Sequence, residues 1–253
     1  MTQSGRERRV LEAVVSLVDS LLDDYDVVEL LNQLTERCTQ LLDVSSAGLL
    51  LADTRSRLHL MAATSGKTRD LELFQLQSEQ GPCLDCYATG APVSVADLHA
   101  EAARWPQFVA AATEAEFASV HAVPMRAAGM VLGALGLFGS TVGELNPEDL
   151  LVGQTLAHVA TVTILQEHAP TQDAVLPRLR EALTSQVVVE QAKGFLRARI
   201  GVSTDAAFGL LRTYARAHDL HLSELARRLI SDREPRAAIV ASLSELAAEQ
   251  RYV

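Results

Sequence analysis

The sequence contains little cysteine, no long apolar run and no internal repeat. Its three cysteines, Cys38, Cys83 and Cys86, are too few for a disulfide framework, and no signal peptide precedes them, so we expect a reducing cytoplasm. No apolar run reaches the roughly 18 residues of a transmembrane helix, so we expect no membrane span and no membrane partner. The absence of an aromatic stacking ribbon argues against a platform for single-stranded nucleic acid.

Charge is divided unevenly along the 253 residues, a length that suits one large or two medium domains. The formal net charge of −10 argues against a protein that holds nucleic acid by bulk charge. Residues 171–232 nevertheless contain nine Lys/Arg and seven Asp/Glu, so this segment is +2 and the rest of the chain is −12. A locally basic surface is therefore expected in the last third of the chain.

Residues 1–168 mix helical and strand patterns. Apolar residues at helical spacing or helix-starting prolines predict helices over 6–22, 27–42, 82–89, 106–115 and 147–168. Apolar runs bounded by turns predict strands over 47–52, 58–63, 73–77, 93–95, 119–125 and 130–138. Consecutive strands joined by short turns favour an antiparallel sheet with helices packed beside it, which is an α+β fold.

The last third reads as helix throughout. A helix over 174–200 ends at Gly201, which is placed as a C-cap, and Ser203 or Thr204 caps a second helix that extends to about residue 218. Two further helices are predicted over 222–231 and 236–250. This region is expected to be a separate all-α domain.

Several short motifs of the first part resemble the GAF family of small sensory domains. They occur in the family's order over about residues 25–168: Glu79-Gln80-Gly81-Pro82-Cys83-Leu84, Thr89-Gly90-x-Pro92-Val93, Asp97-Leu98, Ser119-Val120-x-Ala122-Val123-Pro124-Met125 and Leu132-Gly133-Ala134-Leu135-Gly136-Leu137. The resemblance implies a sensor built on an antiparallel sheet. The sequence does not identify the signal, and we expect either an unknown small molecule or a redox change, with no bound cofactor.

A helix with a charged stripe and an internal glycine dominates the last third. Gly194 costs about 1 kcal/mol relative to alanine in a helix, which favours a close approach of another helix or a ligand. The run Glu190-Gln191-Ala192-Lys193-Gly194-x-Leu196, with Ala207-Phe208 and Leu211-Arg212 after it, resembles the ANTAR family of three-helix RNA-binding domains. The resemblance implies binding of paired hairpins in nascent transcripts and transcription antitermination.

The expected RNA contacts combine this resemblance with the charge pattern. Arginine forks and lysines suit phosphate groups, and structured RNA is read largely by shape and backbone contacts. We assign RNA contact to Gln191, Lys193, Gly194, Arg197, Arg199, Arg212 and Arg216. Packing roles are assigned to Ala207, Phe208, Leu211 and Ala215. The alternative interpretation is a solvated face carrying intrahelical charge pairs.

The remaining candidates for chemistry are thiols and one histidine. Cys83 and Cys86 form a C-x-x-C pair near a helix start, which is a possible redox site with lowered pKa values or simply two semi-buried residues. One pair is too few for a closed zinc site, so no metal site is predicted. GAF-like methionine sulfoxide reductases provide an enzymatic alternative. His121, among apolar strand residues, is expected to be a core histidine.

These patterns lead to one hypothesis for the whole chain. We expect an N-terminal helix (1–24), a GAF-like sensor (25–168), a linker (169–173), an ANTAR RNA-binding domain (174–234) and a C-terminal helix (235–253). The apolar stripes of the helices flanking the sensor suit a homodimer, and a signal would change the spacing of two ANTAR units. No catalytic residue is assigned. A DNA-binding regulator remains a further alternative.

Overall fold

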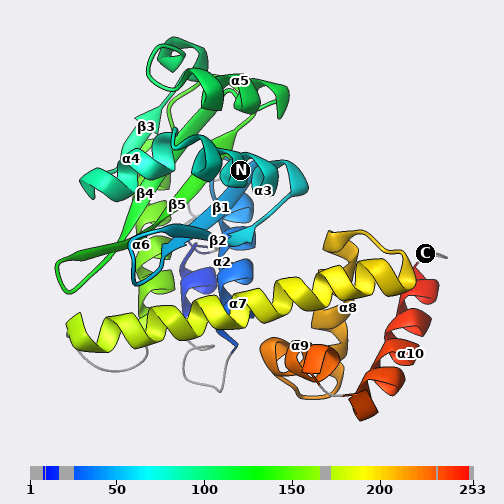
Figure 1. Cartoon of the computed structure of the whole chain (residues 1–253). Helices are drawn as coiled ribbons and strands as arrows, with labels where there is room; N and C mark the ends of the chain where they lie inside the picture. The colour runs from blue at the N-terminus through cyan, green and yellow to red at the C-terminus, as the bar shows by residue number, and fades with distance from the viewer. Residues whose placement is uncertain (1–7, 9, 17–25, 166–171, 232, 251–253) are drawn as a thin grey trace. The chain divides into compact units, whose positions relative to one another are not determined.

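The computed structural model describes residues 8, 10–16, 26–165, 172–231 and 233–250 (Figure 1). Its chain divides into two compact units. One unit consists of residues 1–24 and 30–180, and the other of residues 25–29 and 181–253. The predicted helix over 6–22 is seen as helical residues 10–16, and the rest of it lies mostly outside the described residues.

The first unit is an α+β structure, as predicted. After helical residues 10–16, its elements are α2 (Val27–Leu41, whose first turn belongs to the second unit), β1 (Ser46–Ala52), β2 (Leu58–Ala63), α3 (Gly66–Ser78), α4 (Pro82–Thr89), β3 (Val93–Val95), the 3₁₀ helix η1 (Leu98–Glu101), α5 (Pro106–Glu114), β4 (Ser119–Ala127), β5 (Met130–Gly139) and α6 (Pro147–Leu165).

The five strands form one antiparallel sheet in the order β2-β1-β5-β4-β3. Neighbouring residues of a strand point to opposite faces, so the contacts of Gly136 and Leu137 show what covers each side. A Cβ at Gly136 would meet side chains of α3 and α4, whereas Leu137 lies against Gly153 of α6. The sheet is therefore enclosed by α3 and α4 on one face and by α6 on the other (Figure 1).

The strand predicted over 73–77 is wrong, because these residues lie inside α3. The side chain of Ser65 accepts a hydrogen bond from the Thr68 backbone N–H and caps this helix. Leu71 and Gln75, four residues apart, are both buried, which is helical spacing. A short apolar run does not by itself distinguish a strand from a buried helix, and the cap at Ser65 decides between them.

The second unit is helical, as predicted. It contains most of α7 (Gln172–Ile200), followed by α8 (Thr204–Ala217), α9 (Leu222–Ser231) and α10 (Arg233–Gln250). Gly201 ends α7 with a φ of 71°, and the Ser203 side chain accepts a hydrogen bond from the Ala206 N–H at the start of α8. The predicted linker over 169–173 and the end of the helix predicted over 147–168 lie largely outside the described residues.

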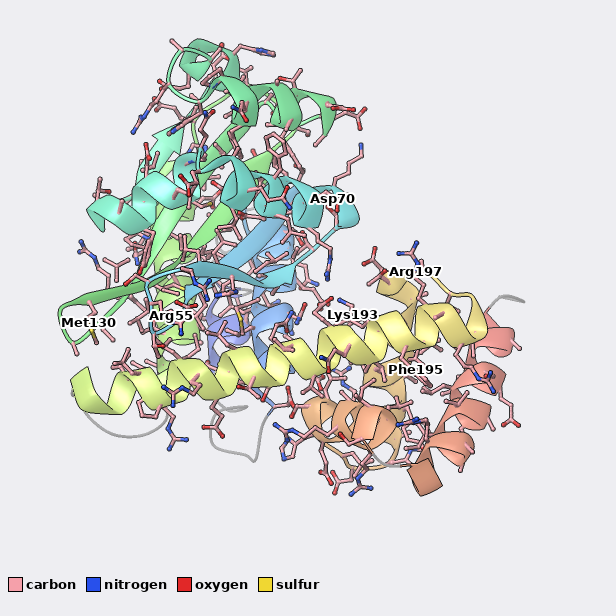
Figure 2. All side chains as sticks on the ribbon, in the orientation of Figure 1. Arg55, Asp70, Met130, Lys193, Phe195 and Arg197 are labelled. Atoms are coloured by element: carbon pink, nitrogen blue, oxygen red, sulfur yellow. The ribbon has the colours of Figure 1, made fainter. Side chains whose placement is uncertain are left out.

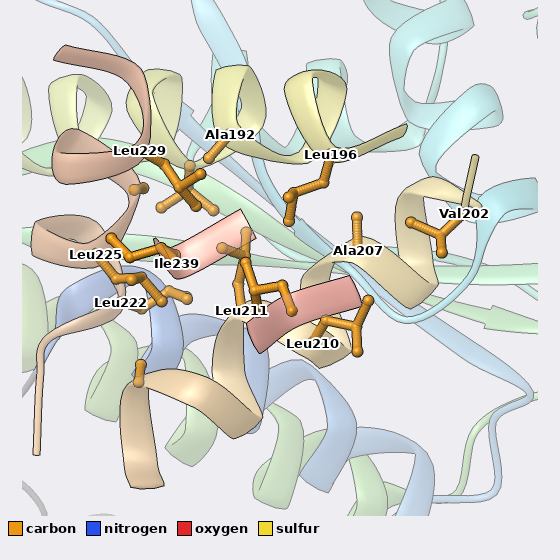
Figure 3. Close-up of a cluster of buried hydrophobic side chains, with 14 of the residues drawn as sticks. Ala192, Leu196, Val202, Ala207, Leu210, Leu211, Leu222, Leu225, Leu229 and Ile239 are labelled. Carbon is orange, nitrogen blue, oxygen red and sulfur yellow. The ribbon is translucent and has the colours of Figure 1, made fainter. Parts of the chain in front are cut away.

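Small and aliphatic side chains from all four helices converge on one core (Figure 3). Ala192 and Leu196 come from α7, Leu211 from α8, Leu225 from α9 and Ile239 from α10. Each fully buried leucine contributes about 2 kcal/mol through burial of apolar surface. This core fixes the rotation of every helix about its axis, and so determines which residues reach the surface of the unit.

None of the helices in the described part of the chain combines the length and apolar character that a membrane span needs.

Candidate functional site

The C-x-x-C pair lies in the interior of the sheet unit, at the start of α4. Cys83 and Cys86 are fully buried and unbridged. The Cys83 backbone N–H donates to Gln75 Oε1 over 3.1 Å, and its Sγ lies 3.7 Å from Glu72 Oε1. The Gln75 side-chain amide also donates to Glu72 Oε2, so α3 and α4 share one polar cluster of Glu72, Gln75 and Cys83.

Burial sets the protonation of this cluster. It raises the pKa of Glu72 to about 8, and it raises the pKa of Cys83 well above the ordinary value, with the neighbouring Glu72 adding to the effect. Burial raises the pKa of Cys86 to about 12. The expectation of lowered thiol pKa values is therefore wrong. A thiol reacts as its thiolate, and the raised pKa values of both cysteines disfavour that form at neutral pH.

Three glycines make room for these polar side chains. A Cβ at Gly48 or Gly136 would lie 2.6 Å or 2.8 Å from Glu72 Oε1, and one at Gly81 would lie 2.3 Å from Gln75 Oε1. Such distances are too short for nonbonded atoms, so larger residues would displace the cluster. The close packing shows why β1, β5 and the turn before α4 carry glycine at these points.

His121 lies in the core of the sheet unit. His121 is buried, its Nε2 accepts a hydrogen bond from the Leu145 N–H at 3.2 Å, and burial lowers its pKa. This environment agrees with the interpretation of His121 as a core residue. Among the described residues, no group of three or more His, Cys, Asp or Glu side chains is arranged to hold a metal ion.

The seven residues assigned to RNA contact have three different environments in the helical unit. Gln191, Gly194, Arg197, Arg199 and Arg216 are exposed, Arg212 is half-buried, and Lys193 is buried. Figure 2 shows Arg197 leaving α7 on the side opposite Phe195, whose ring packs against the core. The helix therefore presents Gln191, Gly194, Arg197 and Arg199 outward. Of the packing assignments, Ala207, Leu211 and Ala215 are fully buried and Phe208 is half-buried.

The Lys193 side chain is buried and does not face the solvent. Its Nζ lies 2.8 Å from Glu190 Oε1 and 5.4 Å from the centre of the Phe208 ring, which belongs to α8. Its side chain is only 5% exposed. The ion pair and the cation–π contact satisfy the ammonium group between α7 and α8. Lys193 is thus part of the contact between these helices.

The two arginines of α8 share one carboxylate. Arg216 lies 2.6 Å (Nη2) and 2.9 Å (Nε) from Glu29 Oε1, and Arg212 Nε lies 3.4 Å from the same oxygen. Glu29 belongs to the short segment 25–29 that is part of this compact unit. Sequence reasoning missed Glu29, Glu72 and Gln75. No local pattern marks a glutamate whose partners lie 183 and 187 residues away.

Two glycines inside the helices of this unit have open space where a side chain would be. A Cβ at Gly194 in α7 or at Gly209 in α8 would have no neighbour within 4 Å. Both glycines are exposed and within helices, where each costs about 1 kcal/mol relative to alanine. Packing among the described residues therefore does not explain either glycine.

The sheet unit and the helical unit each match a known family. The GAF domain family matches residues 24–164, which is more than half of the chain. The chain belongs to the GAF domain family. An ANTAR domain follows, since the ANTAR domain family matches residues 178–230. No curated protein matched the sequence.

Solved structures resemble the GAF part. The GAF domain of a phosphoenolpyruvate-protein phosphotransferase from Coxiella burnetii has a TM-score of 0.50 at 16% identity, covering 61% of this chain and 92% of that one. The free methionine-R-sulfoxide reductase from Neisseria meningitidis has a TM-score of 0.49 at 20% identity, covering 68% and 91%. The likeness to the first structure supports the fold alone. GAF and ANTAR domains are regulatory, so this protein is a signal-dependent regulator of the ANTAR type.

The buried Glu72 generates a prediction about pH. Its folded-state pKa of about 8 lies above the ordinary 4.5, so the folded protein holds a proton that the unfolded chain releases. This contribution to stability is complete below the ordinary pKa and is lost as pH rises through the folded-state pKa. In Glu72→Gln the side chain stays neutral, so we expect the variant to lose less stability than the wild type as pH rises, by up to about 1.4 kcal/mol per pH unit.

Urea unfolding of the wild type and variant over a pH series measures this difference. Glu114→Gln is the matched control, because Glu114 is exposed in the same unit. Parallel stability curves for the wild type and Glu72→Gln would contradict a buried, protonated Glu72.

Proposed function

We propose that this protein binds paired hairpin RNA through the exposed faces of α7 and α8, and that it thereby prevents transcription termination in response to a signal received by its GAF domain. The match of residues 178–230 to the ANTAR family is the observation that carries the proposal. The chemistry of the exposed residues on these helices supports it, as do the two helical glycines.

Exposed arginines supply the contacts to phosphate. Arg197 and Arg199 lie in the last turn of α7, and Arg216 lies in the last turn of α8. A guanidinium fork donates two parallel hydrogen bonds to phosphate oxygens, which suits the backbone of a folded RNA. Double-stranded RNA is recognised largely by shape and backbone contacts, and so needs no aromatic stacking surface.

The open glycines supply a place where a phosphodiester backbone can approach a helix closely. Gly194 lies between Gln191 and Arg197 on the outward face of α7, and its missing side chain leaves the helix backbone accessible. Glycine destabilises a helix by about 1 kcal/mol relative to alanine, and a partner that needs this space would explain its presence at position 194. In this proposal Gln191, Gly194, Arg197, Arg199, Arg212 and Arg216 contact RNA, whereas Lys193 positions α7 against α8.

The GAF unit is proposed to act as a homodimer. Leu151 and Val162 on α6 are 69% and 55% exposed, and Leu11 and Val15 among helical residues 10–16 are similarly exposed. A second copy of the chain would bury these apolar side chains and bring two ANTAR domains together. A light-scattering mass of about one chain of 27.3 kDa would contradict this part of the proposal.

The GAF unit is proposed to sense and not to catalyse. Its buried thiols have raised pKa values, so they lack the thiolate that sulfoxide reduction needs. Turnover of free methionine sulfoxide with a thiol reductant would contradict this assignment.

Replacing both exposed arginines of α7 tests the RNA surface. We expect Arg197→Ala/Arg199→Ala to weaken hairpin binding at least tenfold, because the variant loses two contacts to phosphate. Each lost phosphate contact should also reduce the slope of log affinity against log salt concentration by about 1. Fluorescence anisotropy with the full chain at several salt concentrations measures both quantities. Arg227→Ala, which removes an exposed cation from α9, is the control.

Two further ligands make this experiment decisive. Duplex DNA and single-stranded RNA of equal length are titrated at the same salt. Equal affinity of the double variant and the wild type for the hairpin would show that Arg197 and Arg199 do not contact RNA. Tighter binding of duplex DNA than of hairpin RNA would contradict the RNA-binding proposal and favour a DNA-binding regulator.

Gly194→Ala separates stability from binding. Alanine favours the helix, and its Cβ meets nothing within 4 Å, so we expect a free energy of unfolding about 0.5–1 kcal/mol higher than that of the wild type. Hairpin affinity should nevertheless fall several-fold, because the methyl group occupies space needed by the RNA backbone. Thermal unfolding and anisotropy give the two values. A stabilised variant with unchanged affinity would show that Gly194 is not a contact.

A further inference from the structure

A segment far from the ANTAR domain in sequence is built into its helical unit. Residues 25–29 belong to this unit, although the rest of α2 belongs to the GAF unit. Val28 is completely buried in the core formed by α7, α8, α9 and α10, and Val27 is half-buried against it. Residues 26–29, which we call the masking segment, are therefore held by apolar packing and not only by surface charge.

Asp26 fixes the position of the masking segment. Its Oδ1 accepts the backbone N–H groups of Val28 at 2.9 Å and Glu29 at 3.1 Å, and so caps α2. Its Oδ2 accepts the Ser223 N–H at 2.7 Å in the first turn of α9. One carboxylate thus caps two helices at once. Through this pair of caps, the first turn of α2 is aligned with the ANTAR helices.

This alignment places Glu29 on the arginines of α8. Glu29 Oε1 accepts hydrogen bonds from Nε and Nη2 of Arg216 and lies near Arg212 Nε. The Glu29 side chain is only 15% exposed. A carboxylate and a phosphate present similar oxygens to a guanidinium fork, so Glu29 occupies the donors that the proposed function assigns to RNA phosphate.

We propose that the masking segment is an intramolecular phosphate mimic that lowers RNA affinity until it is displaced. This inference rests on the proposed function, because it assigns Arg212 and Arg216 to RNA. The same N–H donors cannot bind Glu29 and a phosphate together, so RNA competes with the segment. Since the segment continues along the chain into α2 of the GAF unit, a signal that shifts α2 changes the competition.

Two substitutions of Glu29 test the competition in the full chain. Glu29→Gln removes the charge and keeps the shape, and we expect it to bind hairpin RNA about fivefold more tightly. Glu29→Asp keeps the charge but shortens the side chain, so it should also bind more tightly, by about twofold to threefold. The charge-preserving variant separates release of the arginines from reduced repulsion of RNA.

Two controls complete the test. Glu224→Gln removes the same charge from α9 of this unit, where Glu224 pairs with Arg228, and should change affinity less than twofold. In an Arg212→Gln/Arg216→Gln background, Glu29→Gln should give no gain, because its partners are absent. Circular dichroism confirms that each variant is folded.

The outcomes distinguish the two proposals. Suppose that the wild type binds hairpin RNA. If Glu29→Gln then gives no gain in affinity, or Glu224→Gln gives an equal gain, the masking proposal is contradicted and the RNA-binding proposal is not. No binding by the wild type or by any Glu29 variant would overturn both. Gains confined to Glu29 variants that keep Arg212 and Arg216 would support both.

Discussion

The periodicity of α7 is the constraint on which the surface of the ANTAR domain depends. Burial of Ala192 and Leu196 in the shared core fixes the rotation of the helix. That rotation directs Lys193 toward Phe208 and leaves Arg197 and Gly194 outward. A charged stripe read from the sequence is thereby divided into a cation that holds two helices together and cations that can meet a ligand. The apolar core thus determines which charged side chains reach the surface.

The GAF unit shows the converse arrangement, in which polar groups are enclosed. Glu72 and Cys83 lie inside the fold, and burial keeps both protonated at neutral pH. Close packing against Gly48 and Gly136 ties the cluster to β1 and β5. Because the cluster is buried, ionising Glu72 or Cys83 would carry a desolvation cost.

The sequence predicts helices and the antiparallel sheet well, because apolar periodicity and helix caps act over short distances. It fails at 73–77, where a short apolar run is ambiguous between strand and buried helix. It places exposed Arg197 and Arg199 correctly on the surface but cannot show that Lys193 is buried, since that depends on Phe208 in another helix. The pairing of Glu29 with Arg216 spans 187 residues and has no local signal at all.

The central claim is that RNA is bound on the outward faces of α7 and α8, and amide NMR of the full chain with a hairpin RNA tests it most directly. The account predicts that the largest shift changes fall on residues 191–199 and 209–216. The amides of Gly194 and Gly209 should be among them, because both glycines leave the helix backbone open. Changes confined to α9 and α10, or no changes on saturation with hairpin RNA, would contradict the account.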